Sequence, residues 1–311
     1  MLEDRILQIL EKRKFDGILQ AELPKILDAS KSRISEVLSI LEKQEIIVRR
    51  KEAGKNLKVW LKEYSEGSTK IGILRAVEYA KLVSAGEYSF IIYRNAIDLT
   101  RDLALGRIDI GASPLVTQIM FGVMMKTIKI KRVVAENGSG IVYGDSNNKI
   151  FATTEMSAME MNLRAVKNKL GIEGFRYCQS PECLISSLSE VEGIAIWEPY
   201  FSSLNRDKIP FNELEGDYPC CTLAFNTGYL YRNFESVRSL LKDFERSEID
   251  IAKVSSIFDF REYEIKTALK SYRFNPKYEF EDLVEYMKKG GLEISPESLS
   301  TVFDDFGEPE K

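Results

Sequence analysis

From residue 70 onward the sequence alternates between short apolar runs and amphipathic segments, and this alternation restricts the fold more than any other feature. We predict strands at 71–74, 88–93, 107–114, 129–135, 149–153, 193–197 and 222–226. We predict helices at 77–84, 96–105 and 157–169, and a helix-rich tail from residue 234. Strands that alternate with helices are typical of a mostly parallel sheet with helices on both faces, so we predict an α/β fold here.

The first 64 residues follow a different pattern. Apolar residues at helical spacing predict helices at 3–13 and 20–27, and a third helix that ends near Lys43. After Lys43 the apolar period changes to two. This change predicts a hairpin with strands at 46–51 and 57–61 and a basic, glycine-containing tip between them. The head is therefore predicted to be a small α+β domain.

The charge of the chain is uneven. Residues 1–65 hold 14 Lys+Arg and 11 Asp+Glu, a net charge of +3, whereas the remainder has a net charge of −7. The two parts meet at a polar stretch that contains Gly and Ser, so we interpret 65–69 as a linker between domains at 1–64 and 70–311. A slightly basic head on an acidic body indicates an anionic partner for the head alone.

Three helices followed by a basic hairpin resemble the winged helix-turn-helix of prokaryotic transcription regulators. The resemblance implies that the third helix enters the major groove and that the hairpin meets phosphates or a minor groove. The candidate DNA-binding residues are Lys31, Ser32, Arg33, Ser35, Arg49, Arg50, Lys51, Lys55 and Lys58. Two other interpretations stay open: a solvated charged face on a small helical domain, and a module that binds protein.

The chain contains no histidine, which excludes several kinds of site. A Ser-His-Asp triad, a Cys-His dyad, a His-ligated zinc and a haem held by His cannot be built. Catalysis would need carboxylates, Lys, Tyr, Ser or Cys, and the sequence shows no nucleophile beside a base. We therefore predict a protein that is not an enzyme and that has no cofactor.

The four cysteines are Cys178, Cys183, Cys220 and Cys221. A zinc site favours paired C-x-x-C spacing, and two adjacent thiolates are poorly placed to face one metal. We therefore predict no metal site and interpret the cysteines as small buried apolar side chains. A disulfide is the minor alternative, because the cytosol is reducing.

No segment of the sequence is expected to cross a membrane. The longest apolar stretch, 119–125, is far shorter than the roughly 20 residues of a membrane-spanning helix. The first five residues lack the basic-then-apolar layout of a secretion signal. We therefore expect a cytoplasmic protein without a membrane partner.

Four local patterns in the body carry a second resemblance. They are L-G-R-I-D-I-G at 105–111, N-G-S-G at 137–140, T-T-E-M-S-A at 153–158 and I-W-E-P-Y at 196–200. In this order and spacing they resemble type II periplasmic-binding-protein-like domains, in the nitrate, sulfonate and thiamine-pyrimidine branch of solute-binding proteins. The resemblance implies two lobes, the first from about 70–138 and 227–311 and the second from about 139–226, with a ligand between them.

In open α/β sheets, ligands bind beyond the carboxyl ends of strands, where helix N-termini present free N–H groups. The candidate ligand-binding residues are Arg75, Arg94, Asn95, Ser113, Asn137, Ser139, Thr154, Glu155, Ser157, Trp197, Glu198 and Tyr200. Their donors suit an oxyanion, their rings suit a flat ligand and their two carboxylates suit a cationic nitrogen. This mixture predicts a zwitterionic, sulfonate-like or heteroaromatic metabolite, such as a thiamine-pyrimidine-like compound. Helix capping, a surface ion pair and core packing are the ordinary alternatives for these residues.

A DNA-binding head joined to a solute-binding fold predicts a cytoplasmic, ligand-responsive transcription regulator. Its partners would be double-stranded DNA and a small-molecule effector, and it would be a homodimer because prokaryotic half-sites are usually paired. Effector binding would close the lobes by a hinge motion and move the heads. The alternatives are an enzyme on the same fold with the head used for dimerisation, and a binding or scaffold protein whose head contacts protein.

Overall fold

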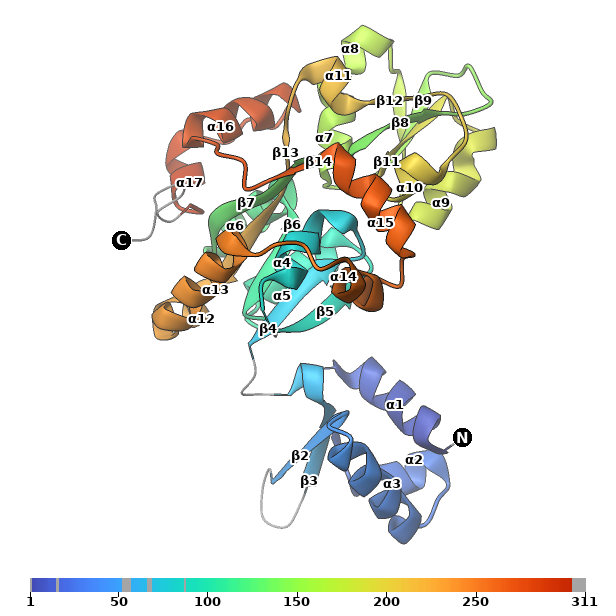
Figure 1. The fold of residues 1–311 in the computed structure, drawn as a ribbon, viewed down its shortest axis with the longest axis vertical. Helices are drawn as coiled ribbons and strands as arrows, with labels where there is room; N and C mark the ends of the chain where they lie inside the picture. The colour runs from blue at the N-terminus through green and yellow to red at the C-terminus, as the bar shows by residue number, and fades with distance from the viewer. Residues whose placement is uncertain (1, 15–16, 52–56, 66–68, 87, 304–311) are drawn as a thin grey trace. The chain divides into compact units, whose positions relative to one another are not determined.

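The computed structural model describes residues 2–14, 17–51, 57–65, 69–86 and 88–303. By its internal contacts the chain divides into two compact units, Met1–Lys70 and Ile71–Lys311, and each is described by itself (Figure 1). Most of the expected linker and the whole hairpin tip, with Lys55, lie outside the described residues. Within the described ranges, every helix is too short or too polar to cross a bilayer.

In the first unit, the described residues form three α-helices and a three-stranded antiparallel sheet. The helices are α1 (Leu2–Arg13), α2 (Leu23–Leu27) and α3 (Lys31–Lys43), and the strands are β1 (Ile18–Leu19), β2 (Ile47–Lys51) and β3 (Leu57–Leu61). The sheet order is β1-β3-β2, and the short turn η2 (Lys62–Tyr64) follows. Ile34, Leu38 and Leu41 are fully buried, because helical spacing places them on one face of α3. Ser30 caps this helix by accepting a hydrogen bond from the Arg33 amide.

The second unit contains a six-stranded sheet with the order β14-β7-β13-β6-β4-β5. Its strands are β4 (Lys70–Leu74), β5 (Ser89–Tyr93), β6 (Ile110–Pro114), β7 (Ile128–Asn137), β13 (Pro219–Asn226) and β14 (Tyr272–Phe274). The helical elements that follow these strands are η3 (Val77–Tyr79), α4 (Ala80–Ser84), α5 (Ala96–Ala104), α6 (Leu115–Met125), α12 (Thr227–Arg232), α13 (Phe234–Arg246), α14 (Ile251–Phe258), α15 (Glu262–Ala268), η5 (Leu269–Ser271), α16 (Phe280–Lys289) and α17 (Pro296–Ser300).

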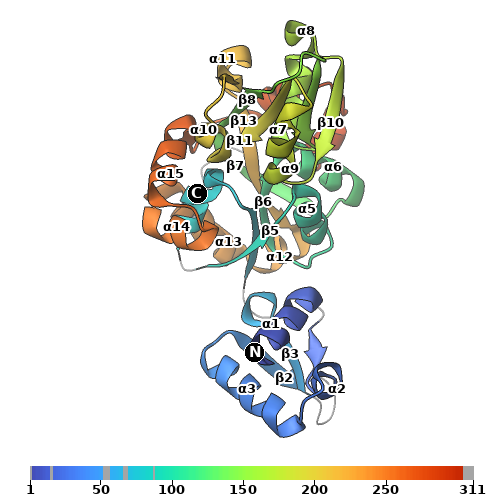
Figure 2. The ribbon, with the colours of Figure 1, turned by 90° about the vertical axis from the view of Figure 1, so that its right-hand side faces the viewer.

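A five-stranded sheet with the order β10-β9-β11-β8-β12 forms the other half of this unit (Figure 2). Its strands are β8 (Ser139–Tyr143), β9 (Ile150–Thr154), β10 (Gly174–Cys178), β11 (Gly193–Trp197) and β12 (Lys208–Pro210). Its helical elements are α7 (Ala158–Ala165), α8 (Lys167–Leu170), α9 (Pro181–Ser186), η4 (Ser187–Ser189), α10 (Tyr200–Ser203) and α11 (Phe211–Glu215). Each sheet has apolar clusters of its own, so the second unit is a two-lobed α/β structure.

The strand pairing corrects the expected mostly parallel sheet. β4 and β6 are parallel, and so are β9 and both of its neighbours, but β13 is antiparallel to β6 and to β7. The physical reason is that β7 leads the chain out of the first lobe, whereas β13 brings it back in the opposite direction. Because β13 begins at Pro219, the return to the first lobe comes earlier than the expected boundary near residue 226.

One glycine separates the strands that carry the chain from the first lobe to the second. β7 ends at Asn137 and β8 begins at Ser139, so the N-G-S-G pattern at 137–140 lies where the chain passes from one sheet to the other. Gly138 has φ of +78°, and a Cβ there would lie 1.8 Å from Cε1 of Tyr272. Conformation and space both require glycine at this position.

Candidate functional site

A chain of aromatic rings that starts at a guanidinium group joins the two lobes. Arg75 follows β4 in the first lobe, and its guanidinium carbon lies 4.8 Å from the ring centroid of Phe260. The Phe260 ring meets Tyr200 edge to face at 6.0 Å, and Tyr200 meets Trp197 in the same way at 5.8 Å. Trp197 ends β11 and Tyr200 begins α10, both in the second lobe. We call Arg75, Phe260, Tyr200 and Trp197 the ring chain; it brings three predicted ligand-binding residues together.

The Arg75 guanidinium is held in place by backbone oxygens after α14. Its Nε donates to the Phe258 carbonyl at 2.7 Å, and Nη2 donates to the Asp259 carbonyl at 3.1 Å. The rest of the group is exposed. Arg75 therefore offers a fixed positive charge beside the ring chain.

Negative charge also surrounds the ring chain. Glu182 lies in the first turn of α9 in the second lobe. A backbone hydrogen bond at Glu182 itself lowers the pKa of its carboxyl, and Ser180 and Arg75 add to this effect. Burial raises the pKa of the Tyr200 hydroxyl, and Glu182 and Glu264 raise it further, whereas Arg75 opposes them. The junction thus presents both signs of charge around aromatic faces, which suits a ligand that carries more than one polar group.

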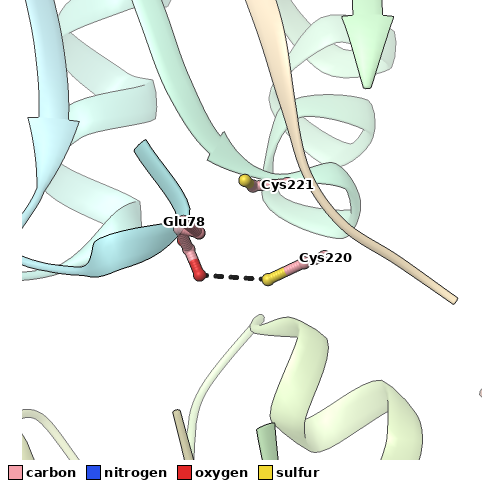
Figure 3. A group of neighbouring side chains, drawn as sticks. All are labelled: Glu78, Cys220 and Cys221. Atoms are coloured by element: carbon pink, nitrogen blue, oxygen red, sulfur yellow. Dashed lines mark hydrogen bonds between the residues drawn. The ribbon is translucent and has the colours of Figure 1, made fainter. Parts of the chain in front are cut away.

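A second polar group is buried inside the first lobe (Figure 3). Glu78 on η3 faces Cys220 and Cys221 on β13, and the Cys220 thiol donates to the Glu78 carboxylate at 3.0 Å. Burial raises the pKa of Glu78 and raises the pKa of Cys221 to about 11. Within the described part of the chain, these three residues are the group of ligand atoms close enough together to hold a metal ion.

The cysteines differ from expectation. Cys178, at the end of β10, forms a disulfide with Cys183 on α9, across a Cα–Cα distance of 5.6 Å. Cys183 is exposed, so the interpretation of all four as buried apolar side chains is wrong for this residue. Cys220 and Cys221 are free and buried, and both sulfur atoms reach the same carboxylate, which adjacent residues on a regular strand could not do.

Two cavities of about 320 Å³ each open near the strands that cross between the lobes. The lining of the first includes Glu136, Asn162, Tyr218, Arg273, Tyr278 and Tyr286. The lining of the second includes Asn137, Gly138, Ser139, Phe201, Lys270 and Tyr272. Neither cavity includes a member of the ring chain. Of the predicted ligand-binding residues, Asn137 and Ser139 line one of these two cavities.

Asn137 and Ser139 also form hydrogen bonds to the segment that returns from the second lobe. The Asn137 side-chain amide donates to Asp217 at 2.8 Å, and its backbone N–H donates to the Tyr218 carbonyl at 3.1 Å. The Ser139 hydroxyl lies 2.8 Å from the Tyr218 hydroxyl. Both residues therefore tie the outgoing strand to the returning one.

Several predicted ligand-binding residues form hydrogen bonds at helix N-termini. Asn95 caps α5 by accepting from the Asp98 amide at 2.8 Å, and Ser157 caps α7 by accepting from the Glu160 amide at 3.1 Å. The Thr154 carbonyl accepts from the Ser157 hydroxyl. These are the ordinary capping roles of such residues.

Ser113 and Glu198, two of the predicted ligand-binding residues, are fully buried. The Ser113 hydroxyl pairs with Thr100 at 3.0 Å inside the first lobe. Glu198 accepts hydrogen bonds from the hydroxyls of Ser202 and Ser271, so its charge is already satisfied. Arg94 and Glu155 are exposed and lie outside the ring chain.

In the first unit, the Arg49 side chain forms hydrogen bonds within its own domain. Its Nε donates to Glu42 at 2.9 Å and its Nη2 to the Ser39 hydroxyl at 3.2 Å, and 15% of the side chain is exposed. The Lys58 ammonium lies 5.5 Å from the Trp60 ring centroid. Glu42 thus neutralises one of the cations expected to meet phosphate.

The remaining candidate DNA-binding residues lie on α3 and β2. Lys31, Ser32, Arg33 and Arg50 are exposed, and Ser35 is partly buried. Lys51 is the last residue of β2. The side chains of Lys31, Ser32, Arg33 and Arg50 thus lie on a solvated polar surface.

Sequence reasoning missed Phe260, Glu182 and Glu78. Phe260 and Glu182 had no usable signal, because the first lies just beyond a helix and the second is one of many surface carboxylates. Glu78 had one: it interrupts the apolar segment that begins at Val77 and continues through Tyr79. A charged residue flanked in this way indicates a buried group with a special role.

No protein-family model and no curated protein sequence matches this chain. Solved structures match it in fold. A ligand-binding component of an ABC-type import system from Staphylococcus aureus, with zinc bound, is 18% identical at a TM-score of 0.63, over 77% of this chain and 95% of its own. The periplasmic aliphatic sulphonate-binding protein SsuA from Escherichia coli is 15% identical at a TM-score of 0.55, over 73% and 91%. The periplasmic nitrate-binding protein NrtA from Synechocystis PCC 6803 is 16% identical at a TM-score of 0.57, over 76% and 86%. The second unit's architecture is therefore the two-lobed α/β fold of periplasmic binding proteins.

These neighbours correct the functional expectation. We predicted a cytoplasmic transcription regulator with double-stranded DNA as its partner, whereas the matching structures include a ligand-binding component of an ABC-type import system and two proteins described as periplasmic solute-binding proteins. The prediction is wrong on the regulatory role, on DNA binding and on the cytoplasmic location. The homodimer was inferred from paired operator half-sites, so that inference loses its basis.

Proposed function

We propose that the chain is a solute-binding protein that holds a small solute between the two lobes of its second unit and serves an ABC-type importer outside the cytoplasm. The fold shared with ligand-binding components of such systems supports this. The disulfide between Cys178 and Cys183 supports the location, because disulfides persist in oxidising compartments. The protein binds without turnover: it has no His, and its free thiols are buried.

The observation that carries the proposal is the ring chain. Arg75 belongs to one lobe and Trp197 and Tyr200 to the other, so a solute that touches all three fixes the lobes together. The lobes must separate for entry and close on the solute, as hinged binding proteins do. Solute binding favours the closed form, because the bound solute contacts both lobes there, whereas in the open form it contacts only one lobe.

The chemistry at the ring chain defines the class of solute. An exposed guanidinium beside aromatic faces favours a sulfonate, carboxylate or similar oxyanion that is attached to a flat or apolar part. Glu182 and Glu264 near Tyr200 also favour a positively charged nitrogen on the same molecule. We therefore propose a small zwitterionic or heteroaromatic solute.

Trp197 provides the experiment. The chain has two tryptophans, and Trp60 lies in the other unit, so the W60F variant leaves Trp197 as the sole tryptophan signal. Alkanesulfonates, taurine, nitrate and aminopyrimidines are titrated into this variant while its fluorescence is recorded. We expect a saturable change with at least one aminosulfonate or aminopyrimidine, and a solute at 100 times its Kd stabilises the fold by about 2.7 kcal/mol.

Arg75→Ala should weaken that binding at least about tenfold, which corresponds to the roughly 1.4 kcal/mol of one charge-assisted contact. Arg94→Ala is the matched control, because Arg94 is also an exposed arginine of the first lobe but lies outside the ring chain. Binding that survives R75A and W197F but is lost in K270A would move the site to the second cavity and contradict the proposal. So would the absence of binding by every solute in the panel.

We also propose that the first unit has the winged-helix arrangement, with residues 65–69 as its linker to the second unit. Three helices followed by the β2–β3 hairpin support this, and β1 adds the third strand by pairing with β3. Deuterium exchange on the full chain tests it: amides of β1 and β3 should be protected together, because they share one ladder. Fast exchange at β1 with full protection of β3 would contradict the arrangement.

A further inference from the structure

An irregularity in β13 turns two adjacent cysteines to one side. Successive side chains of a regular strand point to opposite faces. Between Pro219 and Thr222, however, the register of β13 against β7 shifts twice, on either side of Cys221. Such a bulge re-aims side chains. As a result, both Sγ atoms and a carboxylate oxygen of Glu78 lie within 4.8 Å of one another (Figure 3).

This group is sealed from solvent and contains a buried carboxyl group. Glu78 is 5% exposed, Cys220 2% and Cys221 0%. The Cys220 thiol donates to the Glu78 carboxylate at 3.0 Å. A buried charge is costly unless it is paired or coordinates a metal. A divalent ion held by the carboxylate and the two sulfur atoms would compensate that charge.

Two tyrosine hydroxyls lie beside Glu78. Tyr79 follows Glu78 on η3, and Tyr272 lies on β14. Both hydroxyls are buried, and hydrogen bonding from each lowers the pKa of Glu78, although neither contact among the described residues has full hydrogen-bond geometry. An ion or a water molecule among these groups would complete the network.

The donor set selects the class of ion. Two sulfur atoms and one carboxylate oxygen suit a thiophilic ion such as Zn²⁺, whereas Mg²⁺ and Ca²⁺ prefer oxygen alone. A tetrahedral Zn²⁺ takes four ligands, which leaves a fourth position for water or for a tyrosine hydroxyl.

We propose that Glu78, Cys220 and Cys221 form a binding site for one thiophilic divalent ion, Zn²⁺ in the simplest case. Two metal–sulfur bonds and one metal–oxygen bond form, and the proton of each thiol leaves to water. The ion links η3, at the end of β4, to the strand that returns from the second lobe. This site is distinct from the ring chain, so it stands whether or not the solute proposal holds.

The test uses the full chain, reduced at neutral pH, freed of metal and titrated with Zn²⁺ alone against a chromophoric chelator. We expect one ion per chain. Cys220→Ser, Cys221→Ser and the C220S/C221S double variant should each weaken binding beyond the roughly 10–100-fold that loss of an outer-shell partner costs. Glu78→Gln should weaken it less. The matched control is C178S/C183S, which removes the other cysteine pair and should bind as the wild type does.

Co²⁺ gives a second readout that does not depend on how well the variants fold. Co²⁺ bound to the wild-type chain should show thiolate-to-metal charge transfer and the visible bands of a tetrahedral site, and Zn²⁺ should displace it. The absence of these bands in the wild type overturns the proposal. So does Zn²⁺ binding that persists unchanged in C220S/C221S while the circular dichroism of that variant remains native.

Discussion

Cys178 and Cys183 lie five positions apart, on a strand end and a helix start, whereas Cys220 and Cys221 are adjacent on one strand, yet each pair brings its sulfur atoms together. The first pair closes a covalent bond whose second member is exposed. The second pair stays reduced inside the core of the first lobe. The first pair is thus held by its own bond and the second by the packing around it.

This difference shows that cysteine spacing is a guide only when the local backbone is regular. A strand that ends before a helix can bring cysteines five residues apart to disulfide distance, which is an ordinary geometry. Adjacent cysteines share a side of a strand only where the register slips, as it does around Cys221. The consequence of the comparison is that the two pairs should respond to different perturbations.

The largest difference between the two cysteine pairs should be in their reactivity toward a thiol-alkylating reagent. The thiols of Cys220 and Cys221 are buried, so iodoacetamide should modify them only through unfolding, more slowly than in urea by a factor of at least about 1,000. Mass spectrometry should find two modified cysteines in the unfolded chain and four once the disulfide is reduced. Rapid modification of the native chain would show that the first lobe opens at this strand.

The next largest effect should come from a change in the packing around the reduced cysteine pair, measured as a loss in the free energy of unfolding. Gly138→Ala places a Cβ against Tyr272, whose ring borders Glu78, and should lower the free energy of unfolding by roughly 2–3 kcal/mol. Gly171→Ala is the control: Gly171 has φ of +64° and no atom within 4 Å of the added Cβ, so only the backbone strain of about 1 kcal/mol remains. Urea unfolding measures both, and equal losses would refute a packing origin.

Removal of the disulfide should cost less. C178S/C183S opens a loop of sequence separation 5, and loop-closure entropy for so short a loop predicts a loss of about 2 kcal/mol. Urea unfolding of this variant measures the loss, and wild-type chain in excess thiol should show the same decrease. A stability that is unchanged in both cases would mean that packing alone holds α9 to β10.

Acid should affect the disulfide region least. Hydrogen bonds lower the pKa of Glu182, the neighbour of Cys183, below its unfolded value. The folded state therefore binds the proton less readily, so this stabilisation is present at neutral pH and is lost as pH falls through the folded pKa. Glu182→Gln should flatten the acid side of the stability profile slightly, as measured by thermal unfolding between neutral and acid pH. An identical profile would show that these hydrogen bonds do not form in solution.

Much of the second unit followed from apolar periodicity. Strands such as β4, β9 and β11 lie within a residue of their predicted bounds, because each is a run of buried residues between clear breaks. β8, β10 and β12 were missed, since β10 is largely exposed and carries no apolar alternation. Strand direction was mispredicted, because periodicity shows that a strand forms but not which neighbour it pairs with.

The candidate site was less predictable. Arg75, Trp197 and Tyr200 were predicted from their places at or after strand ends, where topology brings loops together, and the structure does bring these three side chains together. Ser157 and Asn95 satisfied the same rule but serve as caps, since short polar residues before a helix have that use regardless of any ligand. The local sequence marks Glu78 as a buried charged residue, but its meeting with Cys220 and Cys221 depends on a register shift in β13, which no local pattern specifies.

The hydrogen bond from Asn137 to the Tyr218 carbonyl has a consequence for modularity. The entry and exit of the second lobe touch, so residues 139–217 form an insertion whose two ends need almost no span to be joined. Insertions of this kind are tolerated where their ends are close. The first lobe is completed by β14 and the helices near it. We therefore expect it to fold when residues 139–217 are replaced by a short linker or by a foreign domain.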